Sequence, residues 1–161
     1  NYFLITVHRP AAVDHKEVFS KILSGIGQVA DEFHMPIIYP IHPRSRKNLE
    51  NFSLAIPSGI TLIDPLDYFD FLTLSANAKL ILSDSGGIQE EAAIMQVPLV
   101  TLRENTERQE TLTLGSNILA GFELDSIISK TREMLSRASN WQHPYGENVA
   151  KQMLDKIVAL N

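Results

Sequence analysis

Cysteine is absent from the 161-residue chain, which excludes disulfide bonds, a thiolate metal site and a cysteine nucleophile. The sequence also lacks an apolar run of about 18 or more residues and a signal-peptide pattern, so we expect a cytoplasmic globular protein without a membrane partner. The histidines show no zinc-ligand spacing and no nearby acidic pair, so no metal is expected. They are His8, His15, His34, His42 and His143.

Basic residues are too few for a general nucleic-acid surface. The chain has 14 Lys and Arg residues against 19 Asp and Glu, which gives a formal net charge of -5. A local cluster of His and Arg could still bind an anion, so the charge balance favours a small ligand. The hydrophobic content of 44% and the length suit a single domain with a sizeable core.

Apolar runs alternate with helical patterns along the chain. Strands are expected over residues 2–7, 36–41, 60–63, 79–82, 99–102 and 117–120, and helices over 14–33, 68–76, 88–96, 125–134 and 148–160. This order predicts an α/β fold, a three-layer, Rossmann-like parallel sheet of about six strands with helices on both faces. The first strand starts at once, without an initiator methionine, so we expect a piece of a longer protein.

Two details of the helices are also predicted. Asp14 and Asp125 are expected to cap the helices that follow them, because a carboxylate accepts hydrogen bonds from the first free N–H groups. In the helix over 68–76, the spacing predicts that Phe69, Leu72 and Leu74 point inward and that Phe71 lies off that face. Phe71 could cover a flat ring of a ligand, although most aromatic residues of this kind belong to the core.

Residues 83–92, Ser-Asp-Ser-Gly-Gly-Ile-Gln-Glu-Glu-Ala, predict a strand end, a tight turn and a helix start. The free N–H groups and the dipole of a helix N-terminus attract anions. Gly86 and Gly87 would let a ligand approach the backbone, and the Ser85 hydroxyl could cap the helix or contact a phosphate. Glu91 lies one turn further, where a carboxylate can accept from sugar hydroxyls. The alternative is a simple turn followed by a solvated helix face.

Basic side chains follow the first two strands. His8 and Arg9 come after the first strand, and His42 comes after the second. The carboxyl ends of parallel strands are where open sheets bind ligands, so these side chains are well placed for contact. The alternatives are a loop histidine, a surface ion pair and the polar face of a helix. A G-x-G-x-x-G fingerprint is absent, which disfavours a nicotinamide site, and no cofactor is expected.

With these motifs in order, the chain resembles the C-terminal half of the UDP-N-acetylglucosamine 2-epimerases, nucleotide-sugar isomerases with the two-domain glycosyltransferase-B architecture. The blocks that carry the resemblance span nearly the whole chain. They are Thr6-Val7-His8-Arg9, Tyr39-Pro40-Ile41-His42-Pro43-Arg44, Ser83 to Ala92, Arg103-Glu104-Asn105-Thr106-Glu107-Arg108 and Pro144-Tyr145-Gly146.

The resemblance implies that UDP and UDP-N-acetylglucosamine are the ligands. By matching position, Ser85, Gly86 and Gly87 would contact the diphosphate. Glu91 would accept from the ribose hydroxyls, and backbone near Phe71 would contact the uracil. This assignment agrees with the anion site expected from the motif itself.

The resemblance also implies an activity, inversion at C2 of the sugar by elimination and re-addition of UDP. His8 and Arg108 match catalytic positions at the cleft, while Arg9 and His42 match positions that in some bacterial members bind a second, activating UDP-sugar. The carboxylates that complete the site lie in an N-terminal domain that this chain lacks, so we expect the fragment alone to be inactive. A homodimer is expected at full length.

The chain departs from the family at two places. The family commonly has Glu-Asn where this chain has Ala11 and Ala12, and Pro where it has Gln109. These changes could mark a divergent epimerase, a hydrolysing variant that releases N-acetylmannosamine, or a non-catalytic protein that binds the nucleotide sugar. A glycosyltransferase of the same architecture is the remaining alternative.

Overall fold

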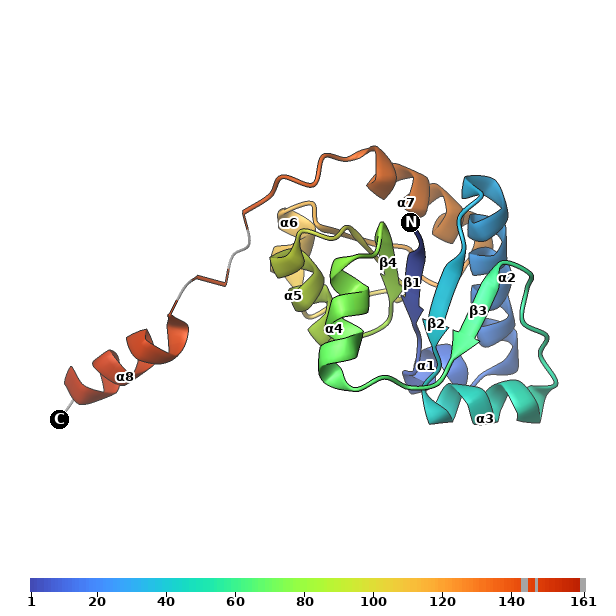
Figure 1. Cartoon of the computed structure of the whole chain (residues 1–161), viewed down its shortest axis with the longest axis horizontal. Coiled ribbons are helices and arrows are strands. Elements are labelled where there is room, and N and C mark those ends of the chain that lie inside the picture. The colour runs from blue at the N-terminus through green and yellow to red at the C-terminus, as the bar shows by residue number, and fades with distance from the viewer. Residues whose placement is uncertain (143–144, 147, 160–161) are drawn as a thin grey trace.

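The computed structural model describes residues 1–142, 145–146 and 148–159. Its centre is a sheet of six strands in which every neighbouring pair is parallel (Figure 1). The order across the sheet is β3-β2-β1-β4-β5-β6. The strands are β1 (Phe3–Thr6), β2 (Ile37–Pro40), β3 (Ile60–Ile63), β4 (Leu80–Ser83), β5 (Leu99–Thr101) and β6 (Asn117–Leu119).

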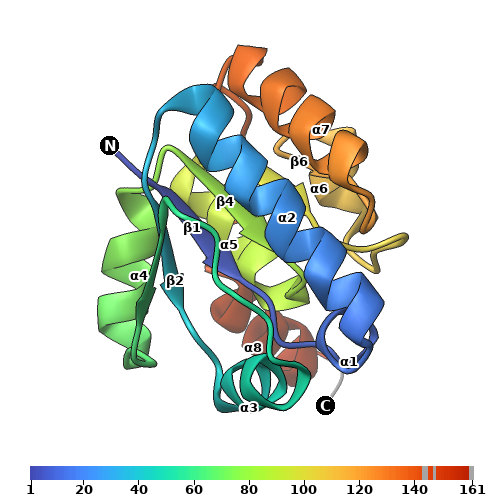
Figure 2. The same cartoon turned by 90° about the vertical axis from the view of Figure 1, so that its right-hand side faces the viewer.

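Helices cover both faces of the sheet. The helices of the described chain are α1 (Pro10–Val13), α2 (Lys16–Phe33), α3 (Pro43–Phe52), α4 (Tyr68–Ala76), α5 (Gly86–Met95), α6 (Gln109–Thr113), α7 (Leu124–Ser136) and α8 (Val149–Ala159), of which α8 does not contact the sheet. Helices α2 and α7 pack side by side on one face (Figure 2), and α4 and α5 cover the other. The predicted three-layer, Rossmann-like α/β fold is therefore confirmed.

The strands are apolar along their length because both faces of the sheet are buried. Successive side chains of a strand point to opposite faces. Accordingly, Phe3 and Ile5 of β1 pack in the core beneath α2 and α7, while Leu4 packs in the core beneath α4 and α5. All three are at most 1% exposed. A buried parallel sheet thus explains why the strand sequences do not alternate with polar residues.

Both predicted aspartate caps are wrong. Pro10 begins the separate short helix α1, so Asp14 lies at the end of α1, and His15 occupies the N-cap position of α2. The Asp14 carboxylate instead accepts from Arg44 Nε, 2.8 Å away, which ties this corner to α3. Helix α7 begins one residue before Asp125, which lies in its first turn without being the cap.

The prediction that Phe69 of α4 points inward is wrong, because its side chain is 77% exposed. Phe71, predicted to lie off the inward face, instead packs against the core beneath α4 and α5, and Leu74 packs there as predicted. They lie three residues apart and share a face with the buried Ser75. Apolar residues occur on two faces of this short helix, and contact with the sheet decides between them.

Helix α8 lies away from the body of the molecule (Figure 1). None of its described residues is buried, and Met153, Leu154 and Val158 are each at least 60% exposed. Within the expected chain break before α8, Pro144 lies outside the described residues, as does His143. Across the described part of the chain, no helix has the length and apolar character needed to cross a membrane.

Candidate functional site

The carboxyl edge of the sheet has a topological switch point between β1 and β4. These strands are neighbours, with Thr6 opposite Ser83, yet the helices after them cover opposite faces. In open parallel sheets a ligand crevice lies at this point. The loop after β1 carries His8 and Arg9, and the loop after β4 leads into the Ser-Gly-Gly motif.

A buried carboxylate joins these two loops. Asp84 is fully buried, and its Oδ2 accepts from the backbone N–H of His8 at 2.9 Å and of Arg9 at 2.7 Å. Its Oδ1 lies 3.2 Å from His8 Nδ1. Asp84 was not predicted as a site residue, although an acidic residue directly after a buried strand was a usable signal. It holds the β1 loop against the β4 loop.

The N-terminus of α5 presents open backbone. Ser85 is at the N-cap position, as expected, but its hydroxyl makes no capping hydrogen bond. A Cβ placed on Gly87 would have no heavy atom within 4 Å, whereas one on Gly86 would lie 2.7 Å from Glu107 Oε1. The carboxylate of Glu107 thus lies beside the helix N-terminus, where the dipole favours negative charge. This edge of the molecule therefore has the surroundings of an anion site.

Two arginines accompany that carboxylate. Arg103 Nη2 lies 2.9 Å from Glu107 Oε2, and Arg9 Nη2 lies 3.5 Å from Glu107 Oε1. The hydrogen bond from Arg103 is the main cause that lowers the pKa of Glu107. The sequence did not predict that Glu107 reaches α5. Glu107 is the group nearest to Gly86, so a phosphate at that position would have to displace its carboxylate from the two guanidinium groups.

Arg108 is positioned by a buried polar network. Thr106 Oγ1 donates to Gln89 Oε1 at 2.6 Å and accepts from the backbone N–H of Arg108 at 3.0 Å. Asn117 Nδ2 also donates to Gln89 Oε1, at 3.1 Å. The Arg108 side chain lies along α5, with its Nε 2.7 Å from Glu90 Oε1. The network thus fixes the loop after β5 to α5.

Replacing Asn117 with alanine is expected to lower the free energy of unfolding by about 2 kcal/mol, since buried partners would lose their hydrogen bonds. Urea denaturation measures this change. The control is Asn51→Ala on α3, where the side chain is exposed and little change is expected. Equal stability of the two variants would contradict a structural role for the network.

Glu91 lies on the side of α5 that faces α4. The Tyr68 hydroxyl donates to Glu91 Oε1 at 3.3 Å, and both residues line a cavity of about 440 Å³. Partial burial raises the pKa of Glu91, and the Tyr68 hydrogen bond opposes this effect. The Phe71 side chain packs into the core, as in the core alternative, so only its backbone remains available for the predicted contact.

His8 and His42 come together at the same edge. Their ring centres are 5.4 Å apart. The His42 Nδ1 accepts from the backbone N–H of Arg44 at 3.1 Å, so His42 caps α3. The structure therefore groups His8, Arg9 and His42 near the start of α5. Glu91 lies further along that helix, where the Arg108 side chain contacts the neighbouring Glu90. Among the described residues no group of three or more His, Cys, Asp or Glu side chains could hold a metal.

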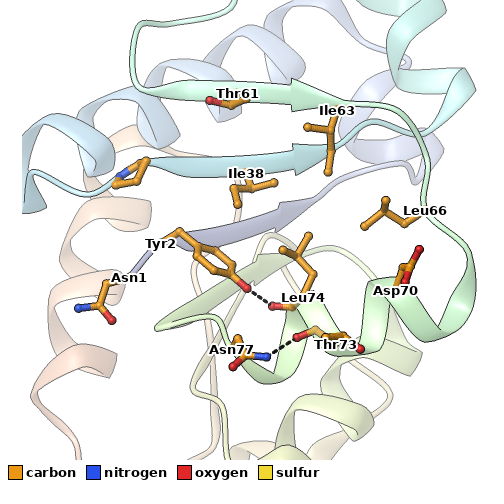
Figure 3. A pocket seen from close by; sticks show the side chains of 11 residues that line it. Asn1, Tyr2, Ile38, Thr61, Ile63, Leu66, Asp70, Thr73, Leu74 and Asn77 are labelled. Carbon is orange, nitrogen blue, oxygen red and sulfur yellow. Dashed lines mark hydrogen bonds between the residues drawn. The ribbon is translucent and has the colours of Figure 1, made fainter.

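A larger cavity of about 630 Å³ lies under α4, away from these residues. Figure 3 shows Ile38, Ile63 and Leu74 around it, with the Tyr2 hydroxyl donating to the Leu74 carbonyl at 2.6 Å. Its lining is mainly apolar. It lacks the convergent charged groups found at the start of α5, so it is the weaker candidate for a catalytic site.

The fold and the switch point define the class of protein, a Rossmann-like α/β domain with a candidate anion site at a helix N-terminus. Within this class, the chain belongs to the UDP-N-acetylglucosamine 2-epimerase family, whose model matches residues 1–159. The predicted family is thereby confirmed.

Named relatives agree with this membership. A UDP-N-acetylglucosamine 2-epimerase of Methanococcus maripaludis is 44% identical over 98% of this chain. The crystal structure of the Methanocaldococcus jannaschii enzyme in complex with UDP-GlcNAc and UDP matches 99% of the chain with a TM-score of 0.91 and 41% identity. The Neisseria meningitidis enzyme bound to UDP-GlcNAc matches all of it, with a TM-score of 0.83 and 31% identity.

The matches cover only part of those proteins. The chain spans 44% of the Methanococcus relative and 45% of each of the two crystallised enzymes. The chain therefore spans about half the length of these relatives.

Proposed function

We propose that the chain is the UDP-binding C-terminal domain of a UDP-N-acetylglucosamine 2-epimerase that interconverts UDP-N-acetylglucosamine and UDP-N-acetylmannosamine. The observation that carries the proposal is the open backbone at Gly87, with Arg9 and Arg103 beside Glu107 near the helix start and with the Glu91 carboxylate one turn further along α5. A diphosphate needs free backbone N–H groups that it can approach, and ribose hydroxyls can donate to a carboxylate acceptor.

The proposed ligand contacts follow from this arrangement. Ser85, Gly86 and Gly87 contact the diphosphate with backbone N–H groups and a hydroxyl that caps nothing in the described structure. Glu91 accepts from the ribose, and backbone near Phe71 contacts the uracil. The cavity beside Glu91 supports this direction for the nucleoside, because it extends from α5 toward α4.

The proposed reaction breaks and re-forms the bond between C1 of the sugar and the diphosphate. A base removes the C2 proton as UDP leaves, and the glycal then accepts UDP while a proton is added to the other face of C2. His8 is the acid or base that this chain contributes, oriented by Asp84, and Arg108 stabilises the charge on the departing diphosphate. Arg9 and His42 are assigned to a second UDP-sugar.

The remaining half of the protein supplies the other acid and base groups. The exposed apolar side chains of α8 support contact with the rest of the protein, because an isolated helix with such a face seldom remains uncovered. We therefore expect no turnover by this chain alone. Homodimer formation at full length and a cytoplasmic location stay predictions.

Other reactions at the same site make different products. A hydrolysing enzyme would release free N-acetylmannosamine, a glycosyltransferase would transfer the sugar to an acceptor, and a non-catalytic module would form no product. Ala11 and Ala12 keep the hydrolysing enzyme and the non-catalytic module open as alternatives, because they stand where the family commonly has polar side chains beside the cleft. Product analysis with the full-length protein separates all four.

The first test is calorimetric titration of the chain with UDP. Saturable binding is expected, and Glu91→Ala and Ser85→Ala should each weaken it about tenfold, since one direct contact contributes roughly 1–3 kcal/mol. The control Glu50→Ala removes an exposed carboxylate on α3 and should leave the dissociation constant unchanged. A control titration with NADH should give no response. Absence of UDP binding would contradict the proposal.

A further inference from the structure

The Glu107 carboxylate occupies the start of α5. Its Oε1 lies 2.7 Å from the position that a Cβ on Gly86 would take, a distance too short for a real methyl group. Gly86 therefore provides the room for this carboxylate, whereas the space around Gly87 is empty. The free N–H groups and the dipole at a helix N-terminus attract negative charge. The chain thus brings an anion of its own to the place where the diphosphate is proposed to bind.

Two guanidinium groups hold the carboxylate in this place. Arg103 Nη2 lies 2.9 Å from Glu107 Oε2, and Arg9 Nη2 lies 3.5 Å from Glu107 Oε1. The hydrogen bond from Arg103 is the largest cause that lowers the pKa of Glu107, and the charges of both arginines lower it further. A negative oxygen between a helix start and two arginines has the surroundings that proteins use for a bound phosphate.

The carboxylate satisfies these arginines only in part. Arg103 Nη2 is shared between Glu107 and Asn105, while its buried Nη1 has no hydrogen-bond partner among the described residues. The contact from Arg9 is at the outer limit of a hydrogen bond. A diphosphate carries more negative charge and more acceptor oxygens than one carboxylate, so it can replace Glu107 as the partner of the two side chains.

The Glu107 side chain can leave without a change in the backbone of its loop. It is 43% exposed, so solvent is open to it. The residues on either side are fixed by the buried network, because Thr106 Oγ1 donates to Gln89 Oε1 at 2.6 Å and accepts from the backbone N–H of Arg108 at 3.0 Å. Rotation of one side chain therefore uncovers Gly86 and releases both guanidinium groups.

A phosphate and the carboxylate cannot share this position. A phosphate oxygen that contacts the backbone at Gly86 would lie next to Glu107 Oε1, and two negative charges at contact distance repel each other strongly where water is partly excluded. Protonation of Glu107 would relieve the repulsion, but its lowered pKa opposes protonation at neutral pH. Binding of a phosphate therefore requires the carboxylate to move out.

We propose that Glu107 makes an autoinhibitory contact: its carboxylate occupies the phosphate position of α5 in the ligand-free chain and is exchanged for the diphosphate when the nucleotide binds. The proposal rests on the proposed function, because it takes the diphosphate to bind at α5. The exchange keeps Arg9 and Arg103 paired with an anion in both states. It also makes the affinity for the nucleotide lower than the same groups would give without Glu107.

The test compares UDP binding by the wild-type chain and by Glu107→Gln, which keeps the size of the side chain and removes its charge. Calorimetry should show that the variant binds UDP at least about threefold more tightly. The control Glu104→Gln removes a carboxylate of the same loop that lies against Gly121 rather than Gly86, and it should keep the wild-type affinity. An equal gain in both variants would overturn the proposal, because net charge alone would then explain it.

Titration with inorganic pyrophosphate separates this proposal from the proposed function. If UDP binds but Glu107→Gln binds it no more tightly than the wild type, the autoinhibitory contact is wrong and the UDP site stands. Weaker binding by the variant would mean that Glu107 orients the arginines for the ligand. If neither chain binds UDP, the proposed function is overturned and pyrophosphate decides the role of Glu107: tighter binding by the variant supports the contact, and equal or absent binding overturns it. Circular dichroism confirms that each variant is folded.

Discussion

Replacing Gly87 with alanine is expected to weaken UDP binding at least tenfold while raising the free energy of unfolding by up to about 1 kcal/mol. The two effects have different causes. Gly87 lies in the first turn of α5 with helical geometry, where alanine is the better helix former. The space around it is empty, so the new methyl group clashes with nothing in the described chain. It would instead occupy the space through which a phosphate reaches the backbone.

Opposite changes in stability and affinity make this variant informative. Thermal denaturation gives the first quantity and calorimetry with UDP gives the second. Gln28→Ala serves as the control, because it improves helix propensity at an exposed position of α2 without touching the site. Wild-type UDP affinity in Gly87→Ala would mean that the phosphates do not contact this turn.

The strand, turn and helix start that form the candidate anion site could be predicted from the sequence because they are adjacent in the chain. A buried strand, a Ser-Gly-Gly turn and a helix start occupy residues 80–92, and the backbone geometry of that unit is local. The edge position of His8, Arg9 and His42 was also predictable, since it follows from the direction of parallel strands. The alternation of strands and helices was sufficient for the three-layer fold.

The contacts that complete the site are long-range, and the sequence offered little signal for them. Glu107 reaches the start of α5 from the loop after β5, and Asn117 of β6 reaches Gln89 on α5. The same limit applies to α4, where Phe69 and Phe71 are equally apolar and only packing against the sheet places one inside. Local patterns therefore predicted the position of the site, and tertiary packing determined its charge pairing.

Asp84→Ala is expected to lower the free energy of unfolding by about 3 kcal/mol. The carboxylate accepts from the backbone N–H groups of His8 and Arg9, and alanine would leave both without an acceptor. For a chain of this length, such a loss corresponds to a fall in melting temperature of roughly 6–12 °C. Thermal denaturation followed by circular dichroism measures it. A melting temperature equal to that of the wild type would show that the Asp84 hydrogen bonds add no stability.

Asp84→Asn separates the hydrogen bonds from the charge. Its amide oxygen can still accept from the same two N–H groups, so at least half of the lost stability should return. If Asn is as destabilising as Ala, the charge of the buried carboxylate, rather than its hydrogen bonds, holds the β1 loop. If Asn restores stability, the hydrogen bonds from the backbone N–H groups of His8 and Arg9 hold the loop without the charge.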